Sequence, residues 1–361
     1  MVGATRGGLA PAKEGVGKNP ERYKLVEPGT IFYNPMRILL GSIALLDEGQ
    51  PPGITSPDYV VFRTRSGMVH PRWFYYWLRS EDGAAFIRTL ARGAVRERML
   101  FRRLVEAEIE VAPYDSQLKF ARAIEFVERA RAAAEAQLEA AKALPAVYRR
   151  AAFTSAEAQR WTRVRLGDLL LEPLRTGISK PARPGADKEC LTLSAIRGGF
   201  LELSAKKTVG VTDKEANGAW VRAEAFYVVR GNGRLSLVGR GALAPRVMPA
   251  PVLYPDLLIQ VIPDTQAITL GYLRHVWGSE EVRADVERRA RTSAGIFKIN
   301  QANLAEVRVP LPDREEQEGL ATQLDRQLAK SDEVRKSAEE RLAAVNNVPA
   351  ALLRRAFSGD L

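Results

Sequence analysis

The sequence predicts a mixed α/β fold made of two similar halves, each of which ends in a long helix. Three observations lead to this prediction: self-similarity at an offset of about 200 residues, alternating strand and helix patterns in each half, and two helical stretches with apolar residues every three or four positions. The 361 residues are 46% hydrophobic and 27% charged, which is enough for two or three domains with apolar cores.

The composition excludes several classes of protein. One cysteine, Cys190, and two histidines exclude a disulfide within the chain and a zinc site of the usual Cys/His spacing. No apolar stretch is long enough to span a bilayer, and residues 1–20 lack the pattern of a signal peptide, so we expect a cytoplasmic protein that does not contact membranes. The net charge of +11 favours a polyanionic partner.

The self-similarity covers most of the chain. The matched pairs keep their order, at offsets of 198 (Gly41 with Gly239), 200 (Trp77 with Trp277, Leu104 with Leu304, Gln117 with Gln317) and 204 (Ala152-Phe153-Thr154 with Ala356-Phe357-Ser358). The drift from 200 to 204 falls in a helical stretch, where four extra residues add about one turn and keep the same face inward. We therefore expect a tandem repeat of one two-part unit.

Four segments follow in order. A first α/β block occupies residues 1–112, a first long helix 113–155, a second block 156–310 and a second long helix 311–361. The basic excess lies mainly in the two blocks, and 41 of the 54 basic residues are arginines, whose planar fork suits phosphates and guanine edges.

The two blocks show the same local pattern. In the first, strands are expected at 23–29, 31–33 and 42–46, with a polar and basic loop at 34–37. In the second, the pattern predicts strands at 225–229 and 235–238 around a loop at 230–234. An aromatic-rich helix follows in each block, at 72–79 and 270–278, and its tryptophans are expected in the core.

The long helices carry heptad-like apolar seams. The first seam comprises Phe120, Ile124, Val127, Ala134, Leu138, Ala141 and Tyr148, and the second comprises Leu320, Leu324, Leu328, Val334, Ala338, Leu342, Val345 and Leu352. Asp313 is placed to cap the second helix, with Glu316 three residues later. We expect the two helices to pair antiparallel as a coiled-coil spacer about 50 Å long. The alternative is an ordinary helical hairpin packed on a core.

Several sequence motifs argue against catalysis by this chain. Asn34-Pro35-Met36 is close to an adenine methyltransferase motif, but Arg37 stands where an aromatic residue would stack on a flipped base. The sequence holds no P-loop. Asp58 and Asp256 follow prolines and are expected in structural turns, since no Glu-x-Lys strand follows either of them.

Four features together resemble the DNA specificity subunit of Type I restriction–modification systems. They are Tyr33-Asn34-Pro35-Met36-Arg37 with Gly41-Ser42-Ile43, Ser56-Pro57-Asp58-Tyr59, Gly93-Ala94-Val95-Arg96, and the closing stretch from Leu352 to Leu361. Arg163 to Asp168 is similar to the start of a target-recognition domain in that family, and Pro310 to Gln317 to the entry of its spacer helix. The resemblance extends from Tyr23 onward.

The resemblance implies a subunit without catalytic activity of its own. Two target-recognition domains would each read one half of a bipartite site in double-stranded DNA. The subunit would dock two modification (methyltransferase) subunits and, through them, restriction subunits. S-adenosylmethionine, ATP and magnesium would belong to those partners, so we expect no cofactor here.

With this role in view, basic and amide residues in loops become candidates for DNA contact, most of them to phosphates. They are Asn34, Arg37, Arg63, Arg65 and Arg96 in the first block, and Arg175, Lys180, Arg197, Arg230, Asn232, Arg234 and Lys298 in the second. The alternative for 231–234 is a plain tight turn. Both helix ends carry a candidate docking patch, Arg149, Arg150 and Phe153, and Arg354, Arg355 and Phe357, whose alternative role is to seat the helix terminus.

One departure from the repeat concerns the first block. It has about 22 residues ahead of Tyr23, whereas the second has about 60 ahead of its Trp220 strand, measured against the internal repeat. We therefore expect that the first domain lacks roughly its first 35 to 40 residues, including any counterpart of Leu166-Gly167-Asp168. The explanation is either an incomplete reading frame or a member of the family with a shortened first domain. A complete first sheet without an exposed apolar edge near residues 20–46 would contradict this.

Two other functions remain open. A non-catalytic adaptor with two domains on a helical spacer would bind protein, and its affinity for duplex DNA would be weak and nonspecific. A nuclease is the third possibility.

Overall fold

The computed structural model describes residues 1–11, 19–91, 97–179, 186–293 and 295–357. The chain forms two compact units. Unit 1 comprises residues 1–138 with 337–361, and unit 2 comprises residues 139–336, so both long helices contribute to both units. Each unit mixes strands and helices, which confirms the predicted fold class.

Unit 1 is built around a short antiparallel sheet in the order β5-β4-β7. Its elements are β1 (Val2–Thr5), β2 (Gly8–Pro11), η1 (Pro20–Arg22), β3 (Lys24–Val26), β4 (Thr30–Tyr33), η2 (Ile38–Leu40), β5 (Ile43–Leu46), β6 (Gly53–Thr55), β7 (Val60–Phe62), α1 (Pro71–Arg79), α2 (Glu81–Leu90) and α3 (Phe101–Val105). Two further antiparallel pairs, β1 with β2 and β3 with β6, complete the strand pairing of the described residues.

Both faces of the central strands of unit 1 are covered. All residues of β4 and β5 are buried. Ile31 and Tyr33 pack in the cluster that contains Trp73 of α1, whereas Phe32 packs in the cluster that contains Ala4 of β1. Because side chains alternate along a strand, a sheet covered on both faces requires strands that are almost entirely apolar, and Thr30 is the polar residue buried in β4.

Unit 2 contains a six-stranded sheet in the order β11-β12-β16-β14-β17-β9. Its elements are α5 (Ala156–Arg160), β8 (Thr162–Arg165), η3 (Leu166–Leu169), β9 (Arg175–Thr176), β10 (Ala186–Leu191), η4 (Leu193–Ala195), β11 (Ile196–Arg197), β12 (Phe200–Leu201), β13 (Lys206–Val211), α6 (Asp213–Ala216), β14 (Phe226–Val229), β15 (Gly231–Asn232), η5 (Leu235–Leu237), β16 (Gly241–Leu243), β17 (Leu258–Val261), α7 (Leu270–Val276), α8 (Glu280–Arg289), β18 (Arg291–Ser293), β19 (Ile296–Lys298), α9 (Gln301–Ala305) and β20 (Arg308–Leu311). Side chains again alternate along the central strand β14: Phe226 and Val228 pack in one core, and Tyr227 and Val229 pack in the other. The predicted core tryptophan Trp277 is 2% exposed.

Residues 235–238 correct one prediction. The strand expected there is the 3-10 turn η5, and the next strand, β16, begins at Gly241. The matching turn in unit 1 is η2, and each turn is followed by a glycine with positive φ, 80° at Gly41 and 70° at Gly239. Apolar residues in a turn of three have no distinct signature, so the run was indistinguishable from a short strand.

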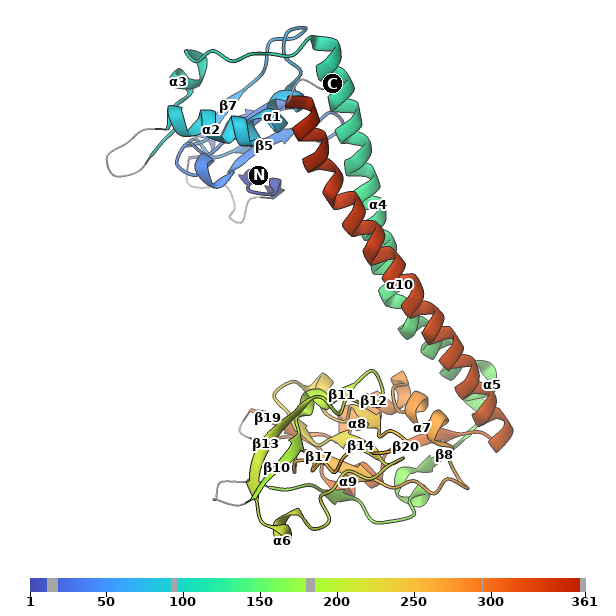
Figure 1. Cartoon of the computed structure of the whole chain (residues 1–361). Coiled ribbons are helices and arrows are strands. Elements are labelled where there is room, and N and C mark those ends of the chain that lie inside the picture. The colour runs from blue at the N-terminus through green and yellow to red at the C-terminus, as the bar shows by residue number, and fades with distance from the viewer. Residues whose placement is uncertain (12–18, 92–96, 180–185, 294, 358–361) are drawn as a thin grey trace. The chain divides into compact units, whose positions relative to one another are not determined.

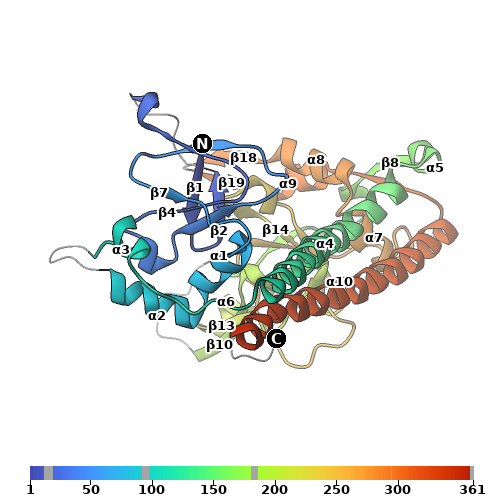
Figure 2. The ribbon, with the colours of Figure 1, turned by 90° about the horizontal axis from the view of Figure 1, so that it is seen from above.

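The long helices are α4 (Tyr114–Phe153) and α10 (Arg314–Phe357), and they lie side by side (Figures 1 and 2). In unit 1, Phe120 of α4 shares a cluster with Leu352 of α10. In unit 2 the opposite ends meet, because Phe153 of α4 shares a cluster with Leu324. The start of each helix therefore packs near the end of the other, as expected for an antiparallel pair.

The first predicted seam is buried apart from Tyr148, which is half-buried. In the second, Leu324 and Ala338 are buried, Val334 is exposed and the other members are half-buried. Val334 is 45% exposed, and Ser331 is the buried residue of that turn, at 3%. The reason is the register: Ser331 lies seven residues after Leu324 and seven before Ala338, whereas Val334 falls off the 3.5-residue repeat. The predicted cap at Asp313 is present, since Asp313 Oδ1 accepts a hydrogen bond from Glu316 N at 2.9 Å.

Two glutamines have the same contacts in the two units. Gln117 Oε1 accepts from His70 N at 2.7 Å, and Gln317 Oε1 accepts from Thr269 N at 2.8 Å. Each Nε2 donates to two backbone carbonyls, those of Met68 and Ala112 for Gln117 and those of Ala267 and Pro312 for Gln317. Both side chains are buried and join a long helix to the residues just before α1 or α7.

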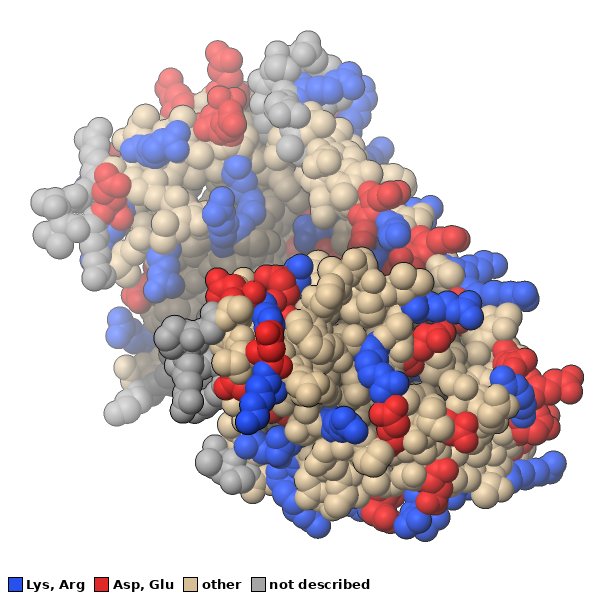
Figure 3. Space-filling view, turned by 60° about the horizontal axis from the view of Figure 1, so that its bottom comes forward, with Lys and Arg blue, Asp and Glu red and all other residues tan. Residues whose placement is uncertain are grey.

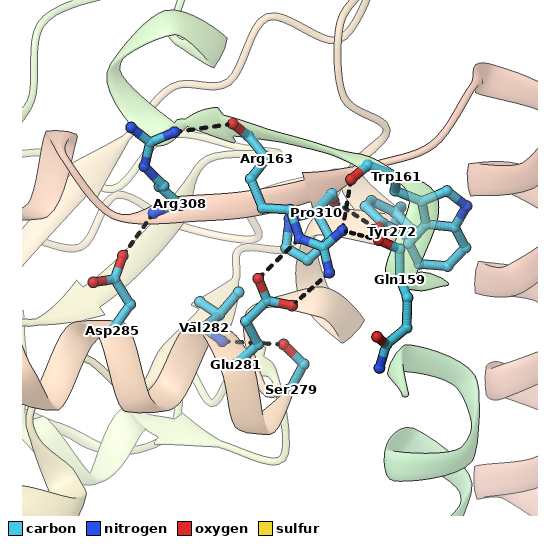
Figure 4. A network of polar contacts seen from close by, with 10 residues as sticks. All are labelled: Gln159, Trp161, Arg163, Tyr272, Ser279, Glu281, Val282, Asp285, Arg308 and Pro310. Atoms are coloured by element: carbon cyan, nitrogen blue, oxygen red, sulfur yellow. Dashed lines mark hydrogen bonds and ion pairs between the residues drawn. The ribbon is translucent and has the colours of Figure 1, made fainter. Parts of the chain in front are cut away.

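The entry to unit 2 is fixed by a polar network around β8, which pairs with β20 (Figure 4). Arg163 of β8 forms a two-pronged ion pair with Glu281 of α8, both contacts at 3.0 Å. Tyr272 donates its hydroxyl to Pro310 O, and Asp285 accepts from Arg308 N. The network therefore binds β8 and β20 to helices α7 and α8.

Among the described residues of unit 1, the segment 108–111, which matches β20 in the repeat, is not in a strand. Apolar side chains are exposed near the start of this unit, Leu25 at 58% and Leu40 at 71%. The shortened first domain therefore stays a prediction.

Candidate nucleic-acid interface

Four of the residues predicted to contact DNA come together in unit 2 around a small sheet. Strand β15 pairs with β19, so that Gly231 lies opposite Lys298. Arg230 precedes β15, Asn232 belongs to it and Arg234 follows it. The fold thus brings Lys298 beside a loop that is distant from it along the chain.

The turn after β15 positions Arg234. Asn232 Oδ1 accepts a hydrogen bond from Arg234 N at 3.1 Å, an Asx turn that places Arg234 at the N-cap of η5 with its side chain exposed. Arg230 is partly buried, and its Nη1 donates to Asp256 O at 3.4 Å. We infer that Arg234 and Lys298 are the more accessible of these cations and that Asn232 holds the shape of the turn.

Arg291 belongs to the same surface and was missed. It starts β18 and lies opposite Lys298 in the register of β18 and β19. The run Arg288-Arg289-Ala290-Arg291 was the available signal, but only the strand pairing places its last member beside Lys298. We call Arg230, Asn232, Arg234, Arg291 and Lys298 the basic sheet.

Unit 1 repeats the turn. Asn34 Oδ1 accepts from Met36 N at 3.0 Å, and Arg37 stands exposed at the N-cap of η2. Arg63 is paired with Glu27 at 2.8 Å, which reduces its availability to a phosphate, and Arg65 is exposed. Arg96 lies outside the described residues.

The remaining candidates of unit 2 are dispersed. Arg175 lies on β9 and Arg197 on β11, at opposite edges of the six-stranded sheet. Lys180 lies outside the described residues. On the face of unit 2 that Figure 3 brings forward, basic and acidic side chains alternate without a single continuous basic field. Local sets such as the basic sheet are therefore the better candidates for recognition.

Comparisons with known proteins support this interpretation of the fold. No family model matches the chain. It is 27% identical over 193 residues to the Type I restriction enzyme EcoKI specificity subunit of Escherichia coli (strain K12), covering 53% of this chain and 41% of that protein. It is 23% identical over 201 residues to the StySPI specificity subunit of Salmonella potsdam, covering 56% and 43%. The matches thus span less than half the length of these relatives.

Solved structures agree. The HsdS subunit from Thermoanaerobacter tengcongensis matches with a TM-score of 0.55 at 19% identity, over 95% of this chain and 84% of that one. A chain from a study of complex assembly and conformational transition in the Type I restriction–modification system matches with a TM-score of 0.61 at 20% identity, over 95% and 85%. The chain is related to Type I specificity subunits. The predicted resemblance is confirmed, and the solved structures show that the fold is shared.

In this relative of the Type I specificity subunits, the residues of the candidate docking patch at the end of α4 differ in exposure. Phe153 is 6% exposed and packs against Tyr272 and Trp161, which favours the alternative that it seats the helix terminus. Arg150 is exposed and lies 3.7 Å from Glu280. Of the second patch, Arg355 is exposed, and the side chains of Arg354 and Phe357 lie outside the described part of the chain.

No cluster of three metal-ligating side chains occurs among the residues that the structure describes. Burial raises the pKa of the Cys190 thiol to about 11, which makes it a poor nucleophile at neutral pH. No helix in the described ranges is long and apolar enough to cross a membrane.

Proposed function

We propose that this chain is the DNA specificity subunit of a Type I restriction–modification complex. The observation that carries the proposal is the similarity over 193 residues to a curated specificity subunit, joined with the gathering of basic residues at the loop 230–234. The positive net charge agrees with a nucleic-acid partner.

The proposed target is a bipartite site, one half for each unit. The support is the repeated turn: Asn34 and Asn232 each cap a turn that presents an exposed arginine at a 3-10 helix, Arg37 in unit 1 and Arg234 in unit 2. An arginine on a preformed turn loses little freedom on binding and can donate two hydrogen bonds to a guanine edge or a phosphate.

The proposed partners supply all chemistry. We propose that this chain is non-catalytic, that it works in the cytoplasm, that it docks methyltransferase subunits and, through them, restriction subunits, and that cofactors bind to those subunits. Arg150 and Arg355 are the exposed members of the proposed docking patches.

Co-expression with the modification (methyltransferase) subunit of its proposed complex, followed by methylome sequencing, tests the proposal. We expect adenine methylation at one bipartite sequence. The double variant Arg230→Gln/Arg234→Gln should lose or relax methylation at one half-site, because two donors in the loop are removed. Arg222→Gln/Arg246→Gln is the matched control, since both arginines are paired with glutamates, at 2.7 and 3.3 Å.

Two outcomes would count against this function. An unchanged methylated sequence in Arg230→Gln/Arg234→Gln would remove the loop from recognition. Absence of any sequence-dependent methylation, with binding to duplex DNA that unrelated competitor DNA abolishes, would favour the protein adaptor instead.

A further inference from the structure

Unit 2 contains a cavity of about 390 Å³ whose walls carry five arginines. They come from five separate segments: the last turns of α4, strand β11, the residue before β16, helix α7 and helix α8. The five are Arg149, Arg197, Arg240, Arg274 and Arg283. Like charges gathered in one cavity repel one another, and an anion bound among them would lower this repulsion.

Carboxylates neutralise only part of this charge. Arg274 is paired with Asp325, and Arg283 lies 3.2 Å from Glu287. Arg149, Arg197 and Arg240 have no ion-pair partner among the residues that the structure describes. Of these three, Arg149 is partly buried, whereas Arg197 and Arg240 are exposed to solvent and the charge of Arg197 acts on Glu202.

Arg149 is the least compensated of the set. Burial and the neighbouring Arg274 guanidinium lower the pKa of Arg149. Its side chain passes Gly278, where an added Cβ would lie 3.8 Å from Arg149 Cδ. A partly buried cation held beside a like charge destabilises the free protein, and such strain is typical of binding sites.

Two further arginines are preorganised. Arg274 is 7% exposed, and its guanidinium lies over the ring of Phe200 at 4.2 Å from the centroid. Arg283 donates from Nη2 to Val238 O at 2.7 Å, while its buried Nη1 has no hydrogen-bond partner. A buried donor without an acceptor is unfavourable, so an incoming oxygen at this atom would stabilise it.

The fold itself does not require these arginines. The equivalent cavity of unit 1, about 680 Å³, lies beside the positive-φ glycine after a 3-10 turn and beside the first helix pair. Its wall combines apolar side chains, among them Leu39, Leu40, Leu78 and Ile87, with the arginines Arg6, Arg79 and Arg88 and the carboxylate of Glu97. Ala84 stands there at about the repeat position of Arg283. The unit 2 cavity differs from it in having five arginines and no carboxylate in its wall.

We propose that this cavity of unit 2 binds a phosphate group. Several arginine forks around one cavity match the oxygens of a dianion or phosphodiester better than a single carboxylate, and the volume admits a phosphate that bears a substituent. The phosphate can come from the backbone of DNA or from a free anion. Only the DNA source rests on the proposed function.

Calorimetric titration of the purified full chain with inorganic phosphate and pyrophosphate, at constant ionic strength, tests the site. We expect saturable binding that weakens about tenfold or more in Arg149→Gln/Arg240→Gln, because charge-assisted hydrogen bonds are lost. Arg160→Gln/Arg326→Gln is the matched control: it removes two charges from exposed positions of unit 2 outside the cavity wall. Without added anion, Arg149→Gln should melt at the same temperature as the wild type or higher, since a like-charge contact is relieved, which separates lost binding from lost folding.

A second titration with fluorescent duplex DNA distinguishes the two sources. If Arg149→Gln/Arg240→Gln weakens DNA binding and lowers its salt dependence while Arg160→Gln/Arg326→Gln does so less, the phosphate is that of DNA. If only inorganic phosphate or pyrophosphate binding is lost, the ligand is a free anion. Absence of saturable binding of either anion together with unchanged DNA binding, or equal losses in Arg160→Gln/Arg326→Gln, would overturn the proposal, whatever the outcome of the methylation experiment.

Discussion

Single side chains with several backbone partners hold the long helices to the two units. Gln117 and Gln317 each accept a hydrogen bond from one backbone N–H and donate to two backbone carbonyls. Each side chain therefore supplies hydrogen-bond partners to three backbone groups. The sequence repeat aligned these glutamines, but it contained no information on what they bind. Their role followed only from the contacts.

Gln317→Leu should lower the free energy of unfolding of unit 2 by about 2–4 kcal/mol, since the partly buried Thr269 N and two carbonyls lose their partner. Urea denaturation followed by circular dichroism measures the loss. Gln323→Leu, at an exposed position of the same helix, is the control and should change stability little. Equal stability of Gln317→Leu and wild type would show that water replaces the amide without cost.

His275 should make unit 2 sensitive to acid. Burial, followed by the charge of Arg274, lowers the pKa of His275 to about 4, despite its hydrogen bond to Asp325 at 2.8 Å. The unfolded chain binds a proton near pH 6.5 and the folded chain only near pH 4, so the stability from this group is present above 6.5 and is lost as the pH falls toward 4. Its amount is on the order of 2–3 kcal/mol.

Thermal melts of wild type and His275→Gln between pH 7 and pH 4.5 test this. The wild type should lose more stability over this range than the variant, because the glutamine side chain of the variant cannot take up a proton. Parallel curves would contradict the predicted role of His275, because other acids contribute equally to both proteins.

At the scale of elements, the register of α10 decides which of its residues are buried in the seam, more than its composition does. Ser331 occupies the buried seam and donates its hydroxyl to Leu328 O, whereas Val334 is exposed. A polar residue in the seam and an apolar residue outside it reduce the difference in hydrophobicity between the two faces of the helix, and helix pairing depends on this difference.

Ser331→Ala should stabilise the protein by about 0.5–1 kcal/mol, because alanine has the higher helix propensity and buries no polar atom. Val334→Ala should change stability by less than about 0.5 kcal/mol, since the side chain is already exposed. Thermal denaturation of both variants checks the register. A larger effect at Val334 than at Ser331 would place the seam where the sequence alone suggested.

At the scale of the whole molecule, charge and duplication are the main features. The net charge of +11 predicts strongly salt-dependent binding to duplex DNA, in which each phosphate contact contributes about −0.9 to the slope of log K against log salt. Arg230→Gln/Arg234→Gln should reduce that slope by up to about 2. Anisotropy titrations over a range of salt measure it, and an unchanged slope would show that neither arginine contacts a phosphate.

The sequence by itself determined the mixed α/β class, the repeated pattern and the long helices, because apolar periodicity and turn residues are local signals that survive without a fold. It also pointed to the loop 230–234. The sequence did not predict which residues from distant segments lie together. Examples are Arg291 beside Lys298, Ser331 in the seam, and the arginine-lined cavity.

The cavity shows why tertiary structure had to decide. Arg149 was predicted for docking and Arg197 for DNA contact, yet both line one cavity with Arg274 and Arg283. Periodicity reports which face of an element is buried, whereas the partners of a charge depend on which elements pack together. Only the packing of α4, β11, α7 and α8 brings these guanidinium groups within reach of one ligand.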